Sequence, residues 1–509
     1  MEADKPAKTN IGWESIIYAT ILLVAMIVRV YHLGTPPLQP SESSRALSSW
    51  QMVNGQNPEA WGEPLLVGST SGIFFLFGDN DFTARLVPAF LGTALVLLPW
   101  FLRGIMGQSG AVATALLLAS SPSFIYFSRS LSEHIYAATL SLLLVVYLFR
   151  YMRGLHSILP LGVVVVLLLC SGAMGFNTII VFAFCFALMF ALDRGWAELK
   201  KPFQAAWGRR QTLAGYTMLA MALFFCVSTG AFTYLQGLGL PSLTAWIKAF
   251  DLPGEGEPWY WHLQLMTAYD TLIMVLGLLG AGYAIFRWRR DGVRETTSFR
   301  VLLVFWAGGN LILLALMGKK EAGQVLLPLL PLALLAGSLV GELARRLNNR
   351  TLSQAALLFS LLGILIFPIH TGWGLNYNNN VTEWLTPCAT SPDVLEMVRA
   401  VEDLSENLLT SEAKVTIDSS IRQPFAWYLR HRPNVDYVDK LTTEAPVIIA
   451  RPEGQTRGEL AGYTMPLQGD LCTGWSGKPF NFRNFWRWFI YHEGWGDERQ
   501  ISVALYLRR

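Results

Sequence analysis

The chain has 509 residues, of which 52% are hydrophobic and only 15% are charged. A soluble globular protein carries about 25% charged residues, so such a deficit over this length requires many buried spans. This composition excludes a disordered chain, a collagen-like fibre and a soluble enzyme with one membrane tether. The net charge of +3, from 39 basic and 36 acidic residues, is too balanced to favour nucleic acid as a partner. The 18 Trp, 17 Tyr and 29 Phe residues suit membrane interfaces. We therefore expect a polytopic α-helical membrane protein.

Apolar windows of about 20 residues, the length that crosses a bilayer, recur along most of the chain. They predict about eleven spans. The windows cover residues 14–33, 83–103, 110–128, 134–151, 157–174, 176–192, 213–235, 268–287, 300–317, 323–342 and 353–371. The first window resembles a signal anchor in length, but Arg29 and the missing small-residue cleavage site predict that it is retained.

The basic residues predict the orientation in the membrane. They fall on alternate connections between the windows, at Arg103, Arg150 with Arg153, 194–210, 287–300 and 345–350. By the positive-inside rule this side is cytoplasmic, together with the N-terminal Lys5 and Lys8. The loop 34–82 and everything after residue 372 are then outside. We therefore expect a multi-pass plasma-membrane protein with a cytoplasmic N-terminus and an extracytoplasmic C-terminal domain.

The composition divides the chain into a membrane domain, residues 1–371, and a more charged domain, residues 372–509. Within the second domain we expect a strand, a helix, an extended segment and a second strand at 414–417, 423–430, 435–438 and 446–450. That order predicts a small α/β domain outside the membrane.

Three of the five cysteines, Cys170, Cys185 and Cys226, lie in apolar windows and are expected to be packing residues. Cys388 and Cys472 both fall in the extracytoplasmic domain, where an oxidising compartment permits a disulfide between them. The sequence does not decide whether the two meet. No spacing of His, Cys and carboxylate residues predicts a metal site.

Charged residues cluster at the outer boundary after the third window. Arg129 and Glu133 are four residues apart and share one face if the segment is helical, with His134 beside them. A charge at this depth needs a partner or water. Two interpretations remain open: a structural ion pair, or binding of an anionic lipid headgroup through the two parallel hydrogen bonds that Arg offers to phosphate.

Several motifs recur in an order that resembles a known family. They are Gly-Asp-Asn-Asp-Phe-Thr-Ala-Arg-Leu-Val-Pro at 78–88, Ser-Pro-Ser-Phe-Ile-Tyr-Phe-Ser-Arg at 121–129, Gly-Lys-Lys-Glu at 318–321, Gln-Pro-Phe-Ala-Trp-Tyr-Leu-Arg at 423–430, and the C-terminal segment 488–508. The chain resembles the GT-C membrane glycosyltransferases, on the branch of the dolichyl-phosphate-mannose protein mannosyltransferases. The prokaryotic proteins described as flippase-activity-associated are more similar still.

The resemblance implies a polyprenyl-phosphate-linked sugar as donor, with its lipid tail in the bilayer. An acidic residue of the first outer loop would act as general base, and cationic side chains would stabilise the departing phosphate. It implies Glu42 or Glu63 as the base, and Arg129, Glu133, His134, Lys319, Lys320, Tyr428 and Arg430 as substrate-binding residues. Glu133 would orient Arg129. For the two lysines a snorkelling, interfacial role stays open, and for Tyr428 ordinary helix packing does.

The sequence departs from the family pattern at three places. Where the family carries Asp-Glu in the first loop, this chain has Ser41-Glu42, and a serine lacks the basicity of a carboxylate. Trp61-Gly62-Glu63 replaces a His-Gly-Pro sequence, and Gly175-Phe176-Asn177 replaces a Lys-Glu pair. Each change removes a polar group from the presumed site.

Two functions follow from these observations. The first is a membrane glycosyltransferase that moves a sugar from a polyprenyl-phosphate donor to an acceptor on the outer face, as in protein glycosylation. The second is a catalytically degenerate relative that serves as a scaffold or accessory subunit of a membrane complex. Membrane lipids and the polyprenyl-phosphate lipid are the expected partners in both, with membrane-complex subunits in the second. The donor lipid is a substrate, and no resident cofactor is expected.

Overall fold

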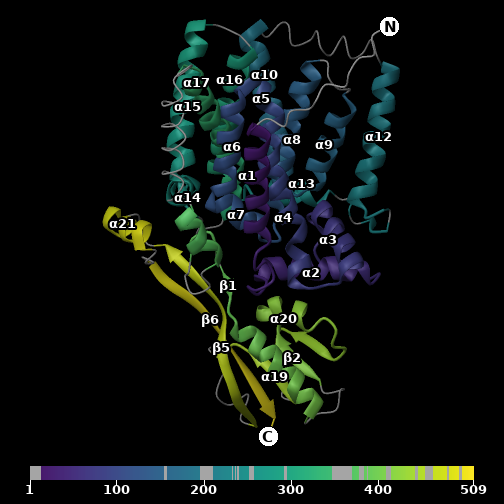
Figure 1. Cartoon of the computed structure of the whole chain (residues 1–509). Coiled ribbons are helices and arrows are strands. Elements are labelled where there is room, and N and C mark those ends of the chain that lie inside the picture. Colours follow the sequence, from purple (N-terminus) through teal and green to yellow (C-terminus); the bar gives the residue numbers. More distant parts are fainter. Residues whose placement is uncertain are drawn as a thin grey trace, which may run out of the picture.

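The computed structural model comprises a helical bundle with a sheet domain at one end (Figure 1). It describes residues 13–153, 158–194, 210–231, 233–235, 237, 240–251, 257–291, 295–346, 369–377, 383–386, 388–407, 414–441, 445–452, 462–477, 481–491 and 496–508.

Hydrophobic helices make up the bundle. In chain order the helices up to the middle of the chain are α1 (Trp13–Val30), α2 (Pro40–Val53), α3 (Pro64–Phe77), α4 (Asp81–Leu97), α5 (Arg103–Met106), α6 (Gln108–Ser120), α7 (Pro122–Ser128), α8 (Glu133–Met152), α9 (Leu159–Cys170), α10 (Ala173–Arg194) and α12 (Arg210–Ser228). They are followed by α13 (Pro241–Lys248), α14 (Trp261–Tyr269), α15 (Thr271–Asp291), α16 (Glu295–Leu316) and α17 (Leu326–Arg346). The short 3₁₀ helices η1 (Leu98–Leu102) and η4 (Ala322–Val325) extend α4 and precede α17.

The multi-pass helical architecture predicted from the sequence is confirmed. Among the described residues, six helices are long and apolar enough to cross a membrane, and the bent pair α6 and α7 makes a seventh if it counts as one span. Shorter apolar helices begin at Ser15, Pro64, Leu159 and Ala214. The predicted count of eleven is not established, because these four are shorter than about 20 residues. The last predicted window, 353–371, lies outside the described residues except at its end.

The segment 34–82, expected to be a loop, instead holds two helices. Helix α2 begins at Pro40 with a capping box, in which the Glu42 side chain accepts the Gln39 backbone N–H. Helix α3 begins at Pro64 and exposes the side chains of Phe75, Leu76 and Phe77. An apolar helix of 14 residues is too short for the spanning pattern, so the sequence search passed over it.

Helix α17 is the centre of the bundle, and nearly all of its apolar window is buried. Small residues let α6 approach it closely. A Cβ atom on Gly337 would lie 1.9 Å from Thr114 Oγ1, and one on Gly341 would lie 2.4 Å from the Met106 carbonyl oxygen. Close backbone approach at small residues is a common means of packing helices in membranes, where lipid is as apolar as the interface.

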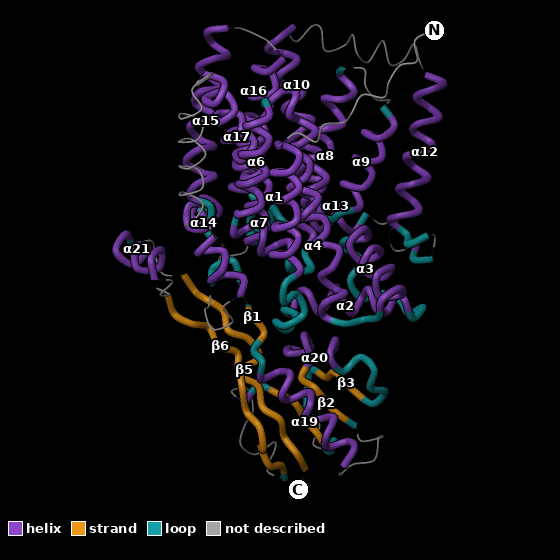
Figure 2. Tube along the Cα trace, in the orientation of Figure 1, coloured by secondary structure: helices purple, strands orange, loops and turns teal. Residues whose placement is uncertain are grey.

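In the described part of the C-terminal domain the strands form one six-stranded sheet in the order β1-β5-β6-β4-β2-β3. Figure 2 draws these strands in orange. The elements of the domain are β1 (Ala389–Thr390), α19 (Asp393–Asn407), β2 (Val415–Asp418), α20 (Arg422–Tyr428), β3 (Val435–Val438), β4 (Val447–Ala450), β5 (Tyr463–Gly477), α21 (Phe482–Tyr491) and β6 (Gly496–Arg508). Strand β2 pairs in parallel with β3 and β4, whereas β6 is antiparallel to β4 and β5. The two predicted strands, the helix and the extended segment are all present.

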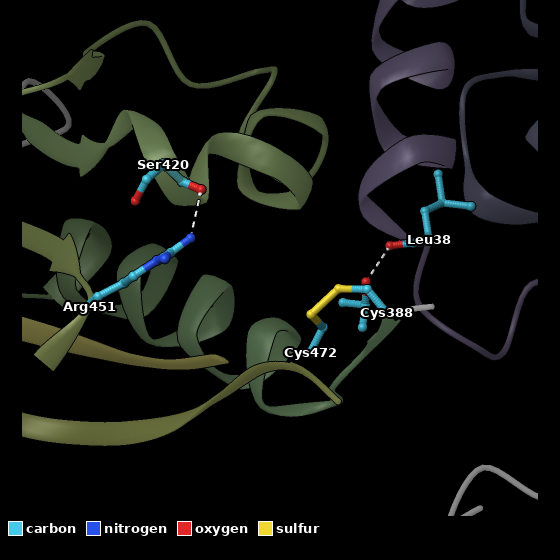
Figure 3. The surroundings of a disulfide bond; sticks show 6 residues. Leu38, Cys388, Ser420, Arg451 and Cys472 are labelled. Carbon is cyan, nitrogen blue, oxygen red and sulfur yellow. Dashed lines mark hydrogen bonds between the residues drawn. A yellow bond between two sulfur atoms is a disulfide. The ribbon is translucent and has the colours of Figure 1, made fainter. Parts of the chain in front are cut away.

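A disulfide joins Cys388, just before β1, to Cys472 in β5 (Figure 3). It therefore links the segment before β1 to the long strand β5, which pairs with β6. Next to it, the Thr390 hydroxyl donates to the Leu38 carbonyl oxygen of the membrane domain. This junction fixes the start of the sheet domain against the bundle.

Helix α20 docks the sheet domain onto the start of α4. The Trp427 indole Nε1 and the Tyr428 hydroxyl donate to the two carboxylate oxygens of Asp81, each at 2.8 Å. Arg430 Nε forms an ion pair with Asp79 Oδ2 at 2.8 Å. The Tyr428 and Arg430 side chains, predicted to bind substrate, thus face the motif at 78–88 and hold the two domains together.

We expect Asp81→Ala to loosen this interdomain contact. It removes the acceptor of the buried Trp427 donor, and a buried group left without its partner costs about 1–3 kcal/mol. Hydrogen exchange should rise in α20, and the melting temperature should fall. Asp436→Ala, which removes an exposed carboxylate paired with Lys414, is the matched control and should change neither quantity appreciably. Unchanged exchange in α20 of the Asp81 variant would contradict this account.

Candidate functional site

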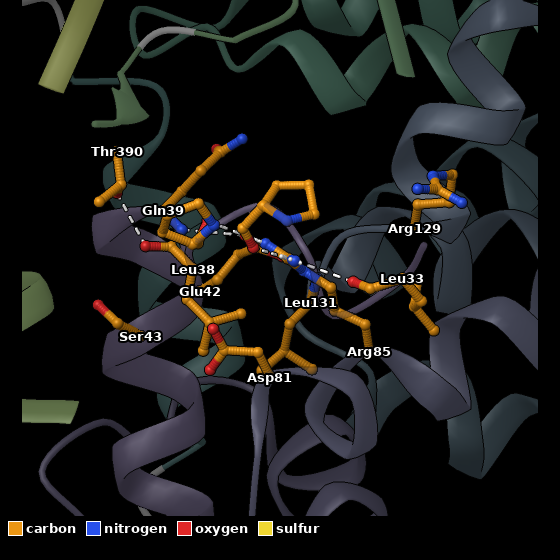
Figure 4. Close-up of polar contacts among 12 residues, drawn as sticks. Leu33, Leu38, Gln39, Glu42, Ser43, Asp81, Arg85, Arg129, Leu131 and Thr390 are labelled. Carbon is orange, nitrogen blue, oxygen red and sulfur yellow. Dashed lines mark hydrogen bonds and ion pairs between the residues drawn. The ribbon is translucent and has the colours of Figure 1, made fainter. Parts of the chain in front are cut away.

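A buried ion pair between Glu42 of α2 and Arg85 of α4 lies at the end of the bundle that faces the sheet domain (Figure 4). Glu42 Oε1 accepts from Arg85 Nε at 3.0 Å and from the Leu131 backbone N–H at 2.6 Å. Oε2 accepts from Arg85 Nη2 at 2.6 Å and from the Gln39 backbone N–H at 3.0 Å. Both oxygens are therefore engaged twice.

This environment makes Glu42 a poor general base. Burial acts to raise the pKa of its carboxyl, but the Arg85 guanidinium and the two backbone N–H groups outweigh burial and lower the pKa below its usual value. A carboxylate with a lowered pKa and both oxygens occupied holds a proton weakly. The neighbouring Ser41 is exposed and offers no carboxylate.

A cavity of about 190 Å³ lies beside this ion pair, between the bundle and the sheet domain. Glu42, Arg85, Tyr126 and Arg129 line it from the bundle, and Thr390 lines it from the sheet domain. Figure 4 shows Arg129 apart from the Glu42–Arg85 pair.

The Arg129 guanidinium donates hydrogen bonds to backbone carbonyl oxygens at the end of α1. Its Nη1 donates to the carbonyl oxygens of Val28 and Tyr31 at 3.0 and 2.6 Å, and the group lies 4.5 Å from the Tyr377 ring centroid. The expected pairing of Arg129 with Glu133 on one helix face is wrong. Helix α7 ends at Ser128 and α8 begins at Glu133, so the side chains of Arg129 and Glu133 do not share a helix.

A second group of charged side chains, the carboxylate–histidine cluster, gathers Arg45, Glu63, Glu133, His134 and Glu321. Arg45 of α2 binds Glu63, which precedes α3, through two bonds of 2.6 and 2.8 Å. Glu133 and His134 open the first turn of α8, and Glu321 precedes η4. Three segments far apart in the sequence therefore supply its acidic groups.

Glu133 is the least compensated member of the cluster. Its side chain is buried, and its Oε2 atom has no hydrogen-bond partner among the described residues. Gly172, with φ of +124°, leaves the space for this oxygen, because a Cβ atom there would lie 1.5 Å from Oε2. A buried carboxylate oxygen without a partner is costly to keep and is a frequent mark of a functional site.

His134 faces the same space. Its Nδ1 atom lies 2.9 Å from Ser132 Oγ, whereas Nε2 is 3.6 Å from Glu321 Oε2, beyond hydrogen-bond length. The ring packs against Gly323, where a Cβ atom would lie 2.4 Å from the ring. Ligand atoms of Glu133, His134 and Glu321 all lie within 4.8 Å of one another. One imidazole and two carboxylates suit a divalent cation such as Zn²⁺. The sequence did not predict this group, because its members come from α8 and from the η4 segment.

The two lysines of the motif at 318–321 lie beside the cluster but face different partners. Lys319 Nζ forms an ion pair with Glu321 Oε1 at 3.0 Å. Lys320 Nζ donates to the Met317 carbonyl oxygen at 2.5 Å, and burial lowers the pKa of its ammonium group. Near them, burial lowers the pKa of His262 to about 4, and its Nε2 lies 2.9 Å from Gln324 Oε1.

The residues expected to form one site therefore belong to two. Glu42 and Arg129 line the interdomain cavity, whereas Glu63, Glu133, His134 and Lys319 lie in or beside the carboxylate–histidine cluster. Lys320 does not line the cavity that holds Glu42 and Arg129.

The fold is similar to that of two solved GT-C glycosyltransferases. The chain aligns over 97% of its length with 98% of ArnT from Cupriavidus metallidurans bound to undecaprenyl phosphate, at 14% identity and a TM-score of 0.58. It also aligns over 85% of its length with 65% of the apo oligosaccharyltransferase from Archaeoglobus fulgidus, at 14% identity and a TM-score of 0.55. No protein-family model and no curated protein matches the sequence. The likeness to membrane glycosyltransferases expected from the motifs is therefore supported at the level of the fold.

We expect Glu42→Ala to destabilise the protein strongly, because it leaves Arg85 buried without its carboxylate. Breaking a buried ion pair in this way costs about 3–5 kcal/mol. Denaturant unfolding in detergent measures the loss. Glu59→Ala, which breaks an exposed pair with Arg422, is the control and should cost less than about 1 kcal/mol. Equal losses in the two variants would show that the Glu42 pair is not a structural centre.

The same pair predicts an acid-dependent stability. Because the pKa of Glu42 is lowered in the folded state, its stabilising effect is complete above its unfolded pKa of about 4.3. The effect is lost as the pH falls through the lower folded value. In unfolding titrations below neutral pH, wild type should lose more stability than Glu42→Gln. Parallel curves would contradict the prediction.

The carboxylate–histidine cluster should bind Zn²⁺. Isothermal titration of the purified protein should detect about one site, because three ligand groups converge there. Glu133→Gln with His134→Ala should abolish that site. His32→Ala, on the exposed connection after α1, is the control and should leave it intact. Zinc binding that survives in the double variant would place the metal elsewhere.

Proposed function

We propose that this chain is a membrane glycosyltransferase that moves a sugar from a polyprenyl-phosphate donor to an acceptor hydroxyl. The observation that carries the proposal is the carboxylate–histidine cluster, where carboxylates and an imidazole meet next to three cationic side chains, Arg45, Lys319 and Lys320. The full-length similarity to ArnT, solved with undecaprenyl phosphate bound, supports the donor class. The dolichyl-phosphate-mannose branch remains a prediction from sequence motifs.

The geometry distinguishes two roles for the acidic residues. Glu133, with a free oxygen, is the general base that takes the proton of the acceptor hydroxyl. The acceptor oxygen then bonds to the anomeric carbon, and the bond from that carbon to the phosphate oxygen breaks. Glu63 holds Arg45 in place through its two hydrogen bonds. Glu42 positions α2 through its contacts with Arg85 and the Leu131 backbone N–H. In this proposal Glu42 and Glu63 position other groups, whereas the sequence predicted one of them as the general base.

The cations stabilise the leaving group. The phosphate departs with the electron pair of the broken bond, and Arg45 and Lys319 provide positive charge for it. Lys320 precedes Glu321 in the chain, and its Nζ atom donates to the Met317 carbonyl oxygen. A divalent cation held by Glu133, His134 and Glu321 would occupy the carboxylate that acts as base, so it would compete with proton transfer by Glu133. In that state the His134 imidazole is neutral, as metal ligation requires.

The proposed orientation has the N-terminus in the cytoplasm and the sheet domain outside, so transfer takes place on the outer face. Arg103, Arg150 and Arg346 lie at the ends of α5, α8 and α17. Asp81 and Glu133 lie at the opposite ends of α4 and α8. This distribution agrees with the positive-inside rule and supports the proposed orientation, and we propose the plasma membrane as its location.

One observation favours the second candidate, a non-catalytic scaffold. Ser41 replaces the aspartate that the family resemblance implies, and Glu42 beside it is fully bonded within the fold. A scaffold would keep the lipid-binding fold and the interdomain contacts without group transfer. Its partners would be subunits of a membrane complex.

The deciding experiment offers the purified protein in nanodiscs a panel of polyprenyl-phosphate sugars with a hydroxyl acceptor. Release of polyprenyl phosphate is measured. We expect transfer by wild type and at least about a 100-fold loss in Glu133→Gln, as for removal of a general base. Glu396→Gln, an exposed carboxylate of α19, is the control and should transfer normally.

The outcomes separate the two functions. Loss of transfer in the Lys319→Ala variant but not in Lys440→Ala, an exposed lysine of the sheet domain, would support the phosphate role. Full transfer by Glu133→Gln would refute the assignment of the base. Binding of the lipid by wild type without transfer of any sugar would favour the scaffold.

A further inference from the structure

A second cavity, of about 320 Å³, lies at the end of the bundle away from the sheet domain. It is bounded by η1 and α5 on one side and by the last turns of α8 on the other. Helix α4 with η1 and α5 runs 26 residues from Asp81, at the sheet-domain contact, to Met106. At about 1.5 Å per residue this path covers nearly 40 Å, so the cavity and the carboxylate–histidine cluster lie near opposite membrane boundaries.

Three arginines line this cavity. They are Arg103 of α5, Arg150 of α8 and Arg153 directly after α8. Among the described residues, the lining holds these three guanidinium groups and no carboxylate. Arg103 and Arg150 therefore give the cavity a cationic lining, and like charges that face one cavity are stabilised by an anion between them.

Aromatic rings hold two of these arginines in place. The Arg103 guanidinium lies 4.0 Å from the centroid of the Trp100 ring, and that of Arg150 lies 5.6 Å from Phe101. A guanidinium stacked on a ring keeps its in-plane N–H donors available, in the fork that matches two phosphate oxygens. Gly104 leaves room for Arg153, since a Cβ atom there would lie 2.9 Å from Nη1.

The rest of the lining is apolar and includes Ile105, Val146 and Phe149. On the outside of the bundle at this level, Phe101, Tyr151 and Met152 are exposed, Met152 by 67%. Exposed apolar side chains at a helix end in a membrane protein face acyl chains or the interface. The cavity thus combines a cationic lining with exposed apolar side chains beside it, a combination that suits a phospholipid headgroup with its acyl chains.

We propose that this cavity binds the phosphate group of an anionic phospholipid, with the acyl chains lying along the rim. The ligand class is a lipid phosphodiester, and Arg103 and Arg150 are its bidentate donors. The proposal goes beyond glycosyl transfer and does not depend on it. It assigns a lipid site in the leaflet opposite the proposed catalytic cluster.

The test measures lipid retention by the full chain. Protein is reconstituted with phosphatidylcholine and phosphatidylglycerol, extracted gently and examined by native mass spectrometry. Wild type should retain one phosphatidylglycerol in preference to phosphatidylcholine. Arg103→Gln with Arg150→Gln should lower that occupancy about 10-fold or more, because each charge-assisted contact is worth more than a neutral hydrogen bond.

Two further variants keep the result interpretable. Arg103→Lys with Arg150→Lys keeps the charge but loses the fork, and should retain an intermediate amount of lipid. Arg289→Gln with Arg290→Gln removes two arginines near the end of α15 that do not line the cavity, and should behave as wild type. Equal retention in both glutamine double variants would overturn the proposal.

Two other outcomes would also overturn it. Equal retention of phosphatidylcholine would show that the negative charge is not recognised. Displacement of the lipid by inorganic phosphate or glycerol 3-phosphate at comparable concentrations would assign the cavity to a soluble phosphate compound instead. Retention of phosphatidylglycerol that resists free phosphate and falls only in the Arg103 and Arg150 variants supports a lipid site.

Discussion

The buried ion pair between Glu42 and Arg85 is the contact on which the outer end of the bundle depends. It joins α2 to α4, and through the Leu131 backbone N–H it also holds the break between α7 and α8. Arg45 lies one turn further along α2, and Glu133 opens α8 two residues after Leu131. The pair thus sets the positions from which both Arg45 and Glu133 reach the carboxylate–histidine cluster. Because such a pair is costly to bury, its value lies more in fixing geometry than in net stability.

The separation of the two polar regions changes the chemical interpretation of the acidic residues. Glu42 is fully hydrogen bonded and has a lowered pKa, which suits a structural carboxylate. Glu133 has an oxygen without a partner and lies within reach of a histidine and a second glutamate. Position 41 holds no aspartate, but Glu133 offers a carboxylate for the proposed proton transfer. It belongs to α8 and not to α2. In the interdomain contact, the Tyr428 hydroxyl donates to Asp81, and Arg430 forms an ion pair with Asp79.

Local pattern predicted much of the fold. Long apolar windows located α4, α8, α10, α15, α16 and α17, and the strands β2 and β4 were found from short apolar runs. Helix α3 was missed because its apolar run is shorter than a bilayer requires. The site was harder to predict because its groups meet only through tertiary packing. Arg129 and Glu133 look like a helical pair by spacing, but the break after Ser128 turns Arg129 toward the carbonyls that end α1. Nothing local in the sequence brings Glu321 to His134.

The most direct test of the catalytic account is where a donor phosphate binds. A cryo-electron microscopy map of the chain in nanodiscs with added polyprenyl phosphate would locate it. The account predicts phosphate density within hydrogen-bond distance of Arg45 or Lys319, beside Glu133. Density in the interdomain cavity lined by Glu42 and Arg129, with the carboxylate–histidine cluster vacant, would contradict it.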